Sequence, residues 1–110
     1  MEGLFDNVTI KDSNLSLSSF SRSRWKSVAF VACDLTSADM SEMQISQVRF
    51  QDCSLIGSAF FRTDLLGVDL STCRIDGIVV SESMGELKGA KMDLYQSAEF
   101  VRKLGILLAE

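Results

Sequence analysis

Large apolar side chains recur at every fifth position through most of the chain. A second register, two places before each of them, carries Gly, Ala, Ser, Thr, Cys or Val at fourteen of its sixteen positions. Neither register contains a charged or amide side chain. The two registers therefore predict a buried core, and the other three positions of each five predict a surface. The predicted structural core is Phe5, Ile10, Leu15, Phe20, Trp25, Phe30, Leu35, Met40, Ile45, Phe50, Leu55, Phe60, Leu65, Leu70, Ile75 and Val80.

A period of five fits neither an α-helix nor a plain β-strand, whose periods are about 3.6 and 2.0 residues. It requires a backbone that turns a corner every five residues, so that four corners close a square coil of twenty. Such coils stack at the strand spacing of about 4.8 Å, with backbone hydrogen bonds between them. Residues twenty apart support this prediction, because they form a valine column and a mostly cysteine column: Val8, Val28, Val48, Val68, and Ser13, Cys33, Cys53, Cys73.

The pattern resembles the pentapeptide repeat family, whose units read A-(D/N)-(L/F)-x-x. The closest units are Cys33-Asp34-Leu35, Ala38-Asp39-Met40, Thr63-Asp64-Leu65 and Val68-Asp69-Leu70. The resemblance implies an all-β solenoid, a right-handed quadrilateral β-helix of about four to five coils. Some units depart from the motif, since Arg24, Arg49 and Arg74 replace the usual Asp or Asn and Trp25 is unusually bulky for the core.

The repeat weakens after Val80, and we expect a capping α-helix to follow it. Asp93 is a good N-cap with Gln96 as its capping-box partner, and Gly105 suits the left-handed position after a helix. These signals predict a helix over residues 94–104. Its apolar face is expected to carry Leu94, Ala98, Val101 and Leu104.

We expect one domain, in which residues 1–82 form the pentapeptide-repeat β-helix. Residues 83–110 form a terminal partial coil, the capping helix and an apolar tail. Residues 89–96 and 104–106 are similar to the C-terminal end of many pentapeptide repeat proteins. These include the quinolone-resistance proteins that protect DNA gyrase, whose C-terminal element helps form a dimer. No comparable cap precedes Gly3, so a truncated longer repeat protein, a partner over that end and a tolerated open end all stay possible.

No catalytic, cofactor-binding or metal-binding residue is predicted, and we do not expect an enzyme. The chain has no histidine, which removes the commonest general base and the commonest metal ligand. Its three cysteines share the small inward register, so we expect packing rather than a metal site or a disulfide. Four aspartates lie where the repeat motif uses Asp or Asn for corner hydrogen bonds: Asp34, Asp39, Asp64 and Asp69.

The net charge and the cysteines indicate which partners and which cellular compartment to expect. The net charge of −4, from 11 basic and 15 acidic residues, argues against direct binding of nucleic acid. No apolar run approaches the ~18 residues of a membrane-spanning helix, and the first residues do not resemble a secretory signal. An odd number of cysteines without such a signal favours free thiols in a reducing cytoplasm. We therefore expect a cytoplasmic protein that does not act on membranes.

Outward apolar side chains are the candidate interface. One group follows three consecutive corners, and the other lies near the C-terminus: Ile56, Phe61, Leu66, and Phe100, Leu104, Ile106, Leu107, Leu108. Ordinary surface is the alternative interpretation of the first group, because single exposed apolar side chains need no explanation. The lack of a catalytic constellation and the regular surface favour a non-catalytic protein-binding or scaffold module, a rigid rod that self-associates as a homodimer through a coil end. The identity of any other protein partner does not follow from the sequence.

The resemblance to quinolone-resistance proteins implies an alternative function. In it the chain is a DNA mimic that binds DNA gyrase or a related type II topoisomerase and modulates quinolone sensitivity. Four coils span about 19 Å, a length over which duplex DNA carries about 11 phosphates. The chain carries −4, all of it on the repeat body, or about a third of that charge density. The sequence thus allows DNA mimicry without favouring it.

Overall fold

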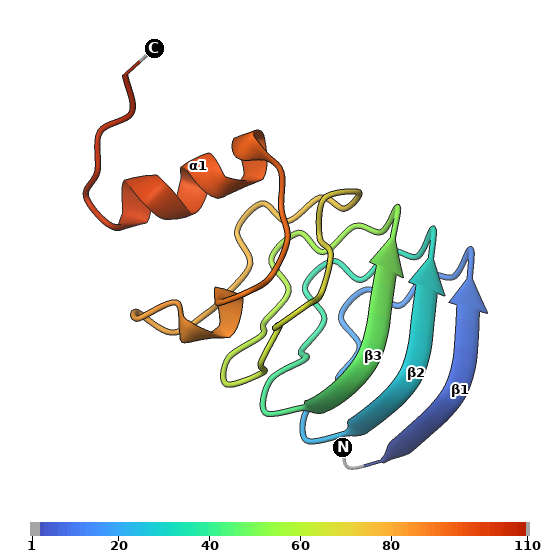
Figure 1. Cartoon of the computed structure of the whole chain (residues 1–110). Helices are drawn as coiled ribbons and strands as arrows, with labels where there is room; N and C mark the ends of the chain where they lie inside the picture. Colours follow the sequence, from blue (N-terminus) through green and yellow to red (C-terminus); the bar gives the residue numbers. More distant parts are fainter. Residues whose placement is uncertain (1–2, 110) are drawn as a thin grey trace.

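The computed structural model describes residues 3–109, and its central feature is a parallel three-stranded sheet. Strands β1 (Leu4–Lys11), β2 (Arg24–Val31) and β3 (Gln44–Gln51) lie side by side in that order (Figure 1). Each residue pairs with the residue twenty positions on, so that the predicted twenty-residue spacing is confirmed as the register of the sheet. The domain limits expected at residues 1 and 110 lie outside the described residues.

A left-handed backbone residue recurs every five positions from Asn7 to Gly67, and again at Gly77, and it explains the period of the sequence. In the middle of the three strands, φ is +54° at Asn7 and +55° at Ser27 and Gln47. This residue resets the inward–outward alternation of the strand, so Trp25 and Val28 of β2 both point inward and are buried. The same conformation recurs at the corners outside the sheet, at Asp12, Leu17, Arg22, Ala32, Ser37, Glu42, Asp52, Gly57, Arg62, Gly67 and Gly77.

The predicted large register forms the core of the molecule. Eleven of its sixteen side chains are buried, including Trp25 at 2% and Phe60 at 1% exposure. The other five pack against this core and stay partly exposed: Phe5, Ile10, Leu15, Ile45 and Val80. Aromatic rings stack along the axis, with centroids 5.9 Å apart for Phe5 and Trp25. The Trp25 Nε1–H, enclosed by these rings, has no hydrogen-bond partner among the described residues.

Backbone hydrogen bonds continue the stacking on the sides that carry no strands. Two series of single bridges keep the twenty-residue register: Asn14, Asp34, Ser54 and Arg74, and Ser19, Asp39, Ala59 and Val79. Between them, each N–H at a large position donates to the coil that follows, as in Leu35 N to Ser54 O at 2.8 Å. The chain is therefore a β-helix, whose three strands form one face.

The stacking is interrupted on that face immediately after β3. No backbone hydrogen bond joins β3 to residues 64–71 within the described part of the chain. Thr63 Oγ1 and Thr72 Oγ1 instead accept hydrogen bonds of 3.0 Å from the N–H groups of Met43 and Asp52, at the two ends of the strand. Residues 64–71 pair with residues 86–91, as in Leu70 N to Lys91 O at 2.7 Å. The far edge of β3 is consequently unpaired.

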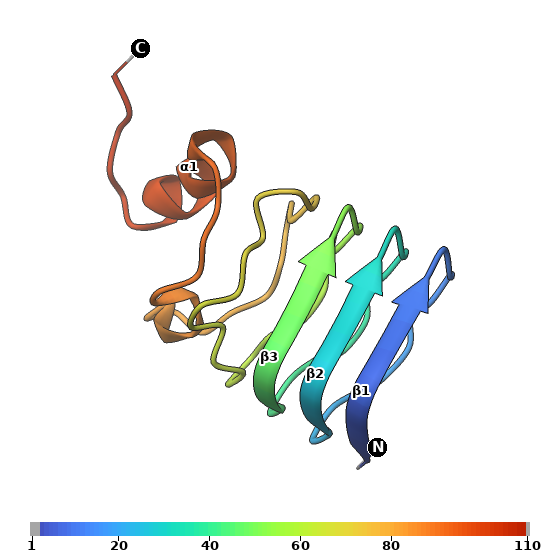
Figure 2. The ribbon, with the colours of Figure 1, turned by 45° about the vertical axis from the view of Figure 1, so that its right-hand side comes forward.

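A 3₁₀ turn, η1 (Gly85–Leu87), and a helix, α1 (Leu94–Lys103), close the end of the stack opposite β1 (Figures 1 and 2). The predicted capping box between Asp93 and Gln96 is confirmed. Gln96 Nε2 also donates to the carbonyls of Leu70 and Cys73, both at 2.7 Å. The helix thus satisfies backbone acceptors that the last coil leaves without a following strand.

The apolar face predicted for α1 is right for two of its four residues: Ala98 and Val101 are half-buried, but Leu94 and Leu104 are exposed. Leu94 is 89% exposed and Leu104 is 61% exposed, whereas Phe100 is only 6% exposed and belongs to the core. The bonds of Gln96 to the coil fix the rotation of the helix, and Phe100 lies one turn further along the same side. Phe100, expected as an interface residue, is therefore a packing residue.

Candidate interaction surfaces

The acidic side chains at the corners are used by the fold. Oδ1 of each of the four predicted aspartates accepts a hydrogen bond of 2.9–3.1 Å from the N–H two residues on: Asp34, Asp39, Asp64 and Asp69. Hydrogen bonds from the hydroxyl and N–H of Thr36 lower the pKa of Asp34. Those of Ser71 lower the pKa of Asp69 in the same way. All four aspartates form turns, as the sequence predicted.

The cysteine column also has a structural role. Cys33, Cys53 and Cys73 are buried free thiols. The Cys53 Sγ lies 3.3 Å from the Phe30 carbonyl oxygen, twenty-three residues earlier. The neighbouring Cys73 sulfur, together with burial, raises the pKa of Cys53 well above its ordinary value. Among residues 3–109, no group of three His, Cys, Asp or Glu side chains is placed to hold a metal ion.

Ser58 and Thr63 repeat the thiol contact with stronger donors. The Ser58 hydroxyl donates to Leu35 O at 2.7 Å, and the Thr63 hydroxyl donates to Met40 O at 2.6 Å. Both side chains are at most 1% exposed. The small inward register therefore combines packing with a hydrogen bond to the preceding coil, which is why hydroxyls and thiols are tolerated there.

The first predicted interface group lies on consecutive corners and is unevenly exposed. Ile56 is half-buried, Phe61 is 40% exposed and Leu66 is 68% exposed. The guanidinium of Arg62 lies 5.2 Å from the centroid of the Phe61 ring, so a cation covers part of this aromatic side chain. Leu66 also packs closely against the backbone at Gly89. At these corners, Leu66 therefore exposes the most apolar surface, and Ile56 the least.

The second predicted group exposes more apolar surface. Leu104, Ile106, Leu107 and Leu108 are 61%, 51%, 96% and 45% exposed. Beside them lies a groove of about 330 Å³ between α1 and the end of the coil stack, which we call the C-terminal groove. Its apolar lining consists of Met84, Leu87, Ala90, Met92, Phe100, Val101 and Leu104.

A sequence model of the pentapeptide repeat region matches residues 4–83, nearly three quarters of the chain. The chain belongs to the pentapeptide repeat family. This agrees with the twenty-residue register of the sheet and with the resemblance noted in the sequence.

Solved structures of other pentapeptide repeat proteins give distant matches. A trypsin-treated form of QnrB1, a plasmid-mediated fluoroquinolone resistance protein, matches with 12% identity and a TM-score of 0.37, over 99% of this chain and 100% of that one. HetL, a pentapeptide repeat protein involved in heterocyst differentiation regulation in the cyanobacterium Nostoc sp. strain PCC 7120, matches with 13% identity and a TM-score of 0.36. That match covers 80% of this chain and 44% of HetL. A comparison with curated proteins gave no significant match.

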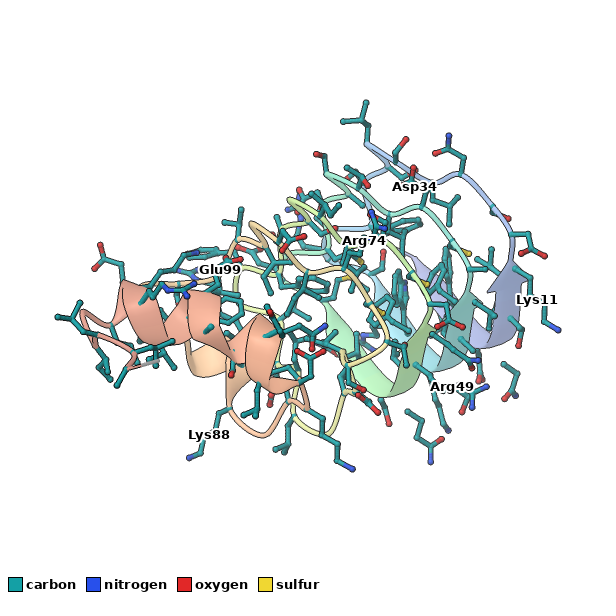
Figure 3. All side chains as sticks on the ribbon, turned by 90° about the horizontal axis from the view of Figure 1, so that it is seen from above. Lys11, Asp34, Arg49, Arg74, Lys88 and Glu99 are labelled. Atoms are coloured by element: carbon teal, nitrogen blue, oxygen red, sulfur yellow. The ribbon has the colours of Figure 1, made fainter. Side chains whose placement is uncertain are left out.

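The surface charge of this pentapeptide repeat protein is mixed. Lys11 and Arg49 lie beside the strands, Asp34 and Arg74 on another side, and Lys88 and Glu99 in the C-terminal part (Figure 3). Across the described residues, no helix is long and apolar enough to span a membrane.

Two features of this pentapeptide repeat protein were not predicted from the sequence. Glu86 is only 6% exposed, and its carboxylate accepts from Arg62 N at 2.9 Å and from the Ser81 hydroxyl at 2.7 Å. The second feature is a crevice of about 260 Å³ at the unpaired edge of β3, which we call the β3 crevice. Neither feature has a local sequence signal, because Glu86 is one of several charged residues after the last repeat and the β3 crevice depends on contacts between segments far apart in the chain.

Proposed function

We propose that this chain is a non-catalytic protein-binding module that self-associates as a homodimer through the C-terminal end of its coil stack. The observation that carries the proposal is the C-terminal groove with its exposed apolar rim, which includes Leu104 at 61% exposure. Apolar surface gathered beside a groove is typical of an interaction site rather than of ordinary surface. The three free thiols favour a reducing, cytoplasmic setting for this module.

The use of the polar groups supports a binding role over catalysis. The buried hydroxyls of Ser58 and Thr63 and the thiol of Cys53 donate to carbonyls of the preceding coil. Asp34 and Asp69 are occupied by turn N–H groups. A nucleophile with an adjacent general base, the arrangement that covalent catalysis needs, is not formed by these groups.

The rigidity of the module follows from its coil geometry. We infer a right-handed, four-sided β-helix of four to five coils, in which residues 1–82 and 83–110 act as one unit. The twenty-residue register and the left-handed residue at every fifth position support four corners to each coil.

Self-association is tested by the mass of the purified chain in solution, measured by light scattering over a range of concentrations. We expect a dimer that Leu104→Ser converts toward monomer, because that side chain borders the C-terminal groove. Leu17→Ser is the matched control, since Leu17 is 80% exposed and lies away from this end of the chain. Circular dichroism should show the same fold for all three proteins.

Phe61→Ser distinguishes the two predicted surfaces in the same assay. A dimer that survives Leu104→Ser but dissociates with Phe61→Ser would move the interface to the corner group. A chain that stays monomeric at every concentration would contradict self-association.

A DNA mimic that binds gyrase is the alternative, favoured by the net charge of −4. The interspersed basic side chains speak against it, since Lys11, Arg49 and Arg74 project from the body among the acidic ones (Figure 3). We therefore rank it below the binding module.

A further inference from the structure

The unpaired edge of β3 contains backbone N–H donors whose counterparts on the neighbouring side of the coil stack are hydrogen-bonded to the next coil. On the neighbouring side, Leu35, Ser37 and Met40 each donate an N–H to the next coil at 2.8 Å. The corresponding residues of β3, ten positions further on, are Ile45, Gln47 and Phe50. Their N–H groups find no backbone acceptor in residues 64–71, the segment that follows on this face. A sheet edge of this kind is a template for an added strand.

The β3 crevice is a small hollow that lies directly against the unpaired edge of β3. Its volume of about 260 Å³ lies just below the range of about 300–1,000 Å³ that ligand pockets occupy. Ile45 and Val48 line one wall, and Leu66 and Val68 line the other. The crevice therefore has a mainly polar surface with a few apolar side-chain atoms, and it lies beside unpaired backbone groups, which are what an added peptide strand pairs with.

The C-terminal tail of the chain, residues 106–109, has the complementary properties. It follows α1 without helix or strand structure and leads away from the body (Figures 1 and 2). Leu107 is 96% exposed, the highest value among the exposed large apolar residues. An apolar tail that becomes buried must also satisfy its backbone N–H and C=O groups. The C-terminal groove is lined mainly by apolar side chains, whereas the edge of β3 presents N–H groups without a backbone acceptor in residues 64–71.

We propose that the β3 crevice receives residues 106–109 of a second copy of this chain as a short added strand. Mutual exchange of tails between two copies gives a closed, two-fold symmetric dimer. This inference rests on the proposed self-association and names the segment and the site that carry it.

The direct test is cross-linking between two copies of the chain that carry tags of different length. One chain carries Ser46→Cys, an exposed position that lines the β3 crevice, and the other carries Leu107→Cys. Under mild oxidation, we expect a disulfide-linked heterodimer of these two chains. Lys88→Cys is the matched alternative, because Lys88 is exposed and lines the C-terminal groove. Oxidised wild-type chain measures the background from the three buried thiols.

Three results would overturn the inference. The first is that Leu107→Cys cross-links to Lys88→Cys in place of Ser46→Cys. The second is a cross-link that forms only within one chain carrying both new cysteines, and the third is no cross-link above background. The first would leave self-association intact.

A second measurement does not depend on new cysteines. Leu107→Asp should weaken dimerisation by about tenfold or more, equivalent to at least about 1.4 kcal/mol. Leu94→Asp should leave it unchanged, since Leu94 is similarly exposed at 89% but lies on α1. In the wild-type dimer, hydrogen exchange of residues 44–51 should slow as concentration rises. If Leu104→Ser dissociates the dimer while Leu107→Asp and the exchange of β3 show no effect, the proposed function stands and the tail insertion fails.

Discussion

At the scale of single residues, the inward small positions determine how the coils are joined. Thr63 shows this most clearly, because its hydroxyl both donates to Met40 O at 2.6 Å and accepts from Met43 N at 3.0 Å. Its side chain is 1% exposed, so water cannot replace either bond. One buried hydroxyl thus closes the stack at the point where backbone pairing with β3 ends.

Thr63→Val should therefore destabilise the protein by about 1–3 kcal/mol, the cost of leaving buried backbone groups unpaired. The shape of the side chain is kept, so packing contributes little. Thr72→Val is the control, since Thr72 makes the equivalent bond to Asp52 N but is exposed, and its loss should stay within about 0.5 kcal/mol. Urea unfolding of both variants measures the difference, and equal losses would refute a special role for Thr63.

At the scale of elements, helix α1 is held by polar contacts more than by an apolar stripe. Gln96 completes the capping box and also donates to Leu70 O and Cys73 O. Glu99 accepts from Gly77 N at 3.2 Å. The helix therefore acts as a substitute for the strand that would otherwise follow.

Gln96→Glu separates the two roles of this side chain. Glutamate retains the acceptor of the capping box but has no N–H to donate to the two carbonyls. We expect a loss of about 1–3 kcal/mol, with faster hydrogen exchange in residues 94–103. Ser97→Ala, on the same turn of α1, should change stability by less than about 0.5 kcal/mol. A Gln96→Glu protein as stable as wild type would show that packing alone holds the helix.

The η1 turn makes stability depend on pH through Glu86. Burial raises the pKa of Glu86, but hydrogen bonds from the Arg62 N–H and from Ser81 outweigh it and hold the pKa below its ordinary value. A lowered folded-state pKa means that the ionised carboxylate stabilises the fold above the unfolded value of about 4.3. This stabilisation is lost as the pH falls through the folded-state pKa. Urea midpoints from pH 7 to pH 3 should fall more steeply for wild type than for Glu86→Gln, and parallel curves would contradict this role.

The sequence predicted the parts of the structure that depend on local periodicity. The inward registers, the capping box and the turn aspartates follow from spacing and from short-range hydrogen bonds. The rotation of α1 did not follow, because Gln96 bonds to residues more than twenty positions away. The unpaired edge of β3 also did not, because it depends on residues 64–71 pairing with 86–91, where Asp69 bridges Lys91 with two residues more than the usual twenty.

At the scale of the whole molecule, basic side chains are interspersed among the acidic ones, and two ion pairs form among residues 3–109. Arg62 Nη1 lies 3.9 Å from Glu42 Oε1, across one twenty-residue step. Lys103 Nζ lies 3.4 Å from Glu99 Oε2 on α1. Exposed pairs of this kind contribute little to stability, but their basic members weaken the negative surface potential that a mimic of DNA would need.

We accordingly expect no effect of the chain on DNA gyrase. At tens of micromolar it should neither inhibit supercoiling nor protect the enzyme from a quinolone, in an assay at low salt, where electrostatic attraction is strongest. Concentration-dependent inhibition or protection would restore the DNA-mimic hypothesis and reject our ranking.

The left-handed residue at every fifth position has a consequence for how such chains change length. Removing one residue from a corner would act like a reading-frame shift in protein form, because each later bulky side chain would turn toward water and its neighbours toward the axis. Removing twenty residues would leave every column in phase. Surviving insertions and deletions among homologous chains should therefore occur in whole coils, or be confined to the segment after the last repeat, where counting in fives has already ended.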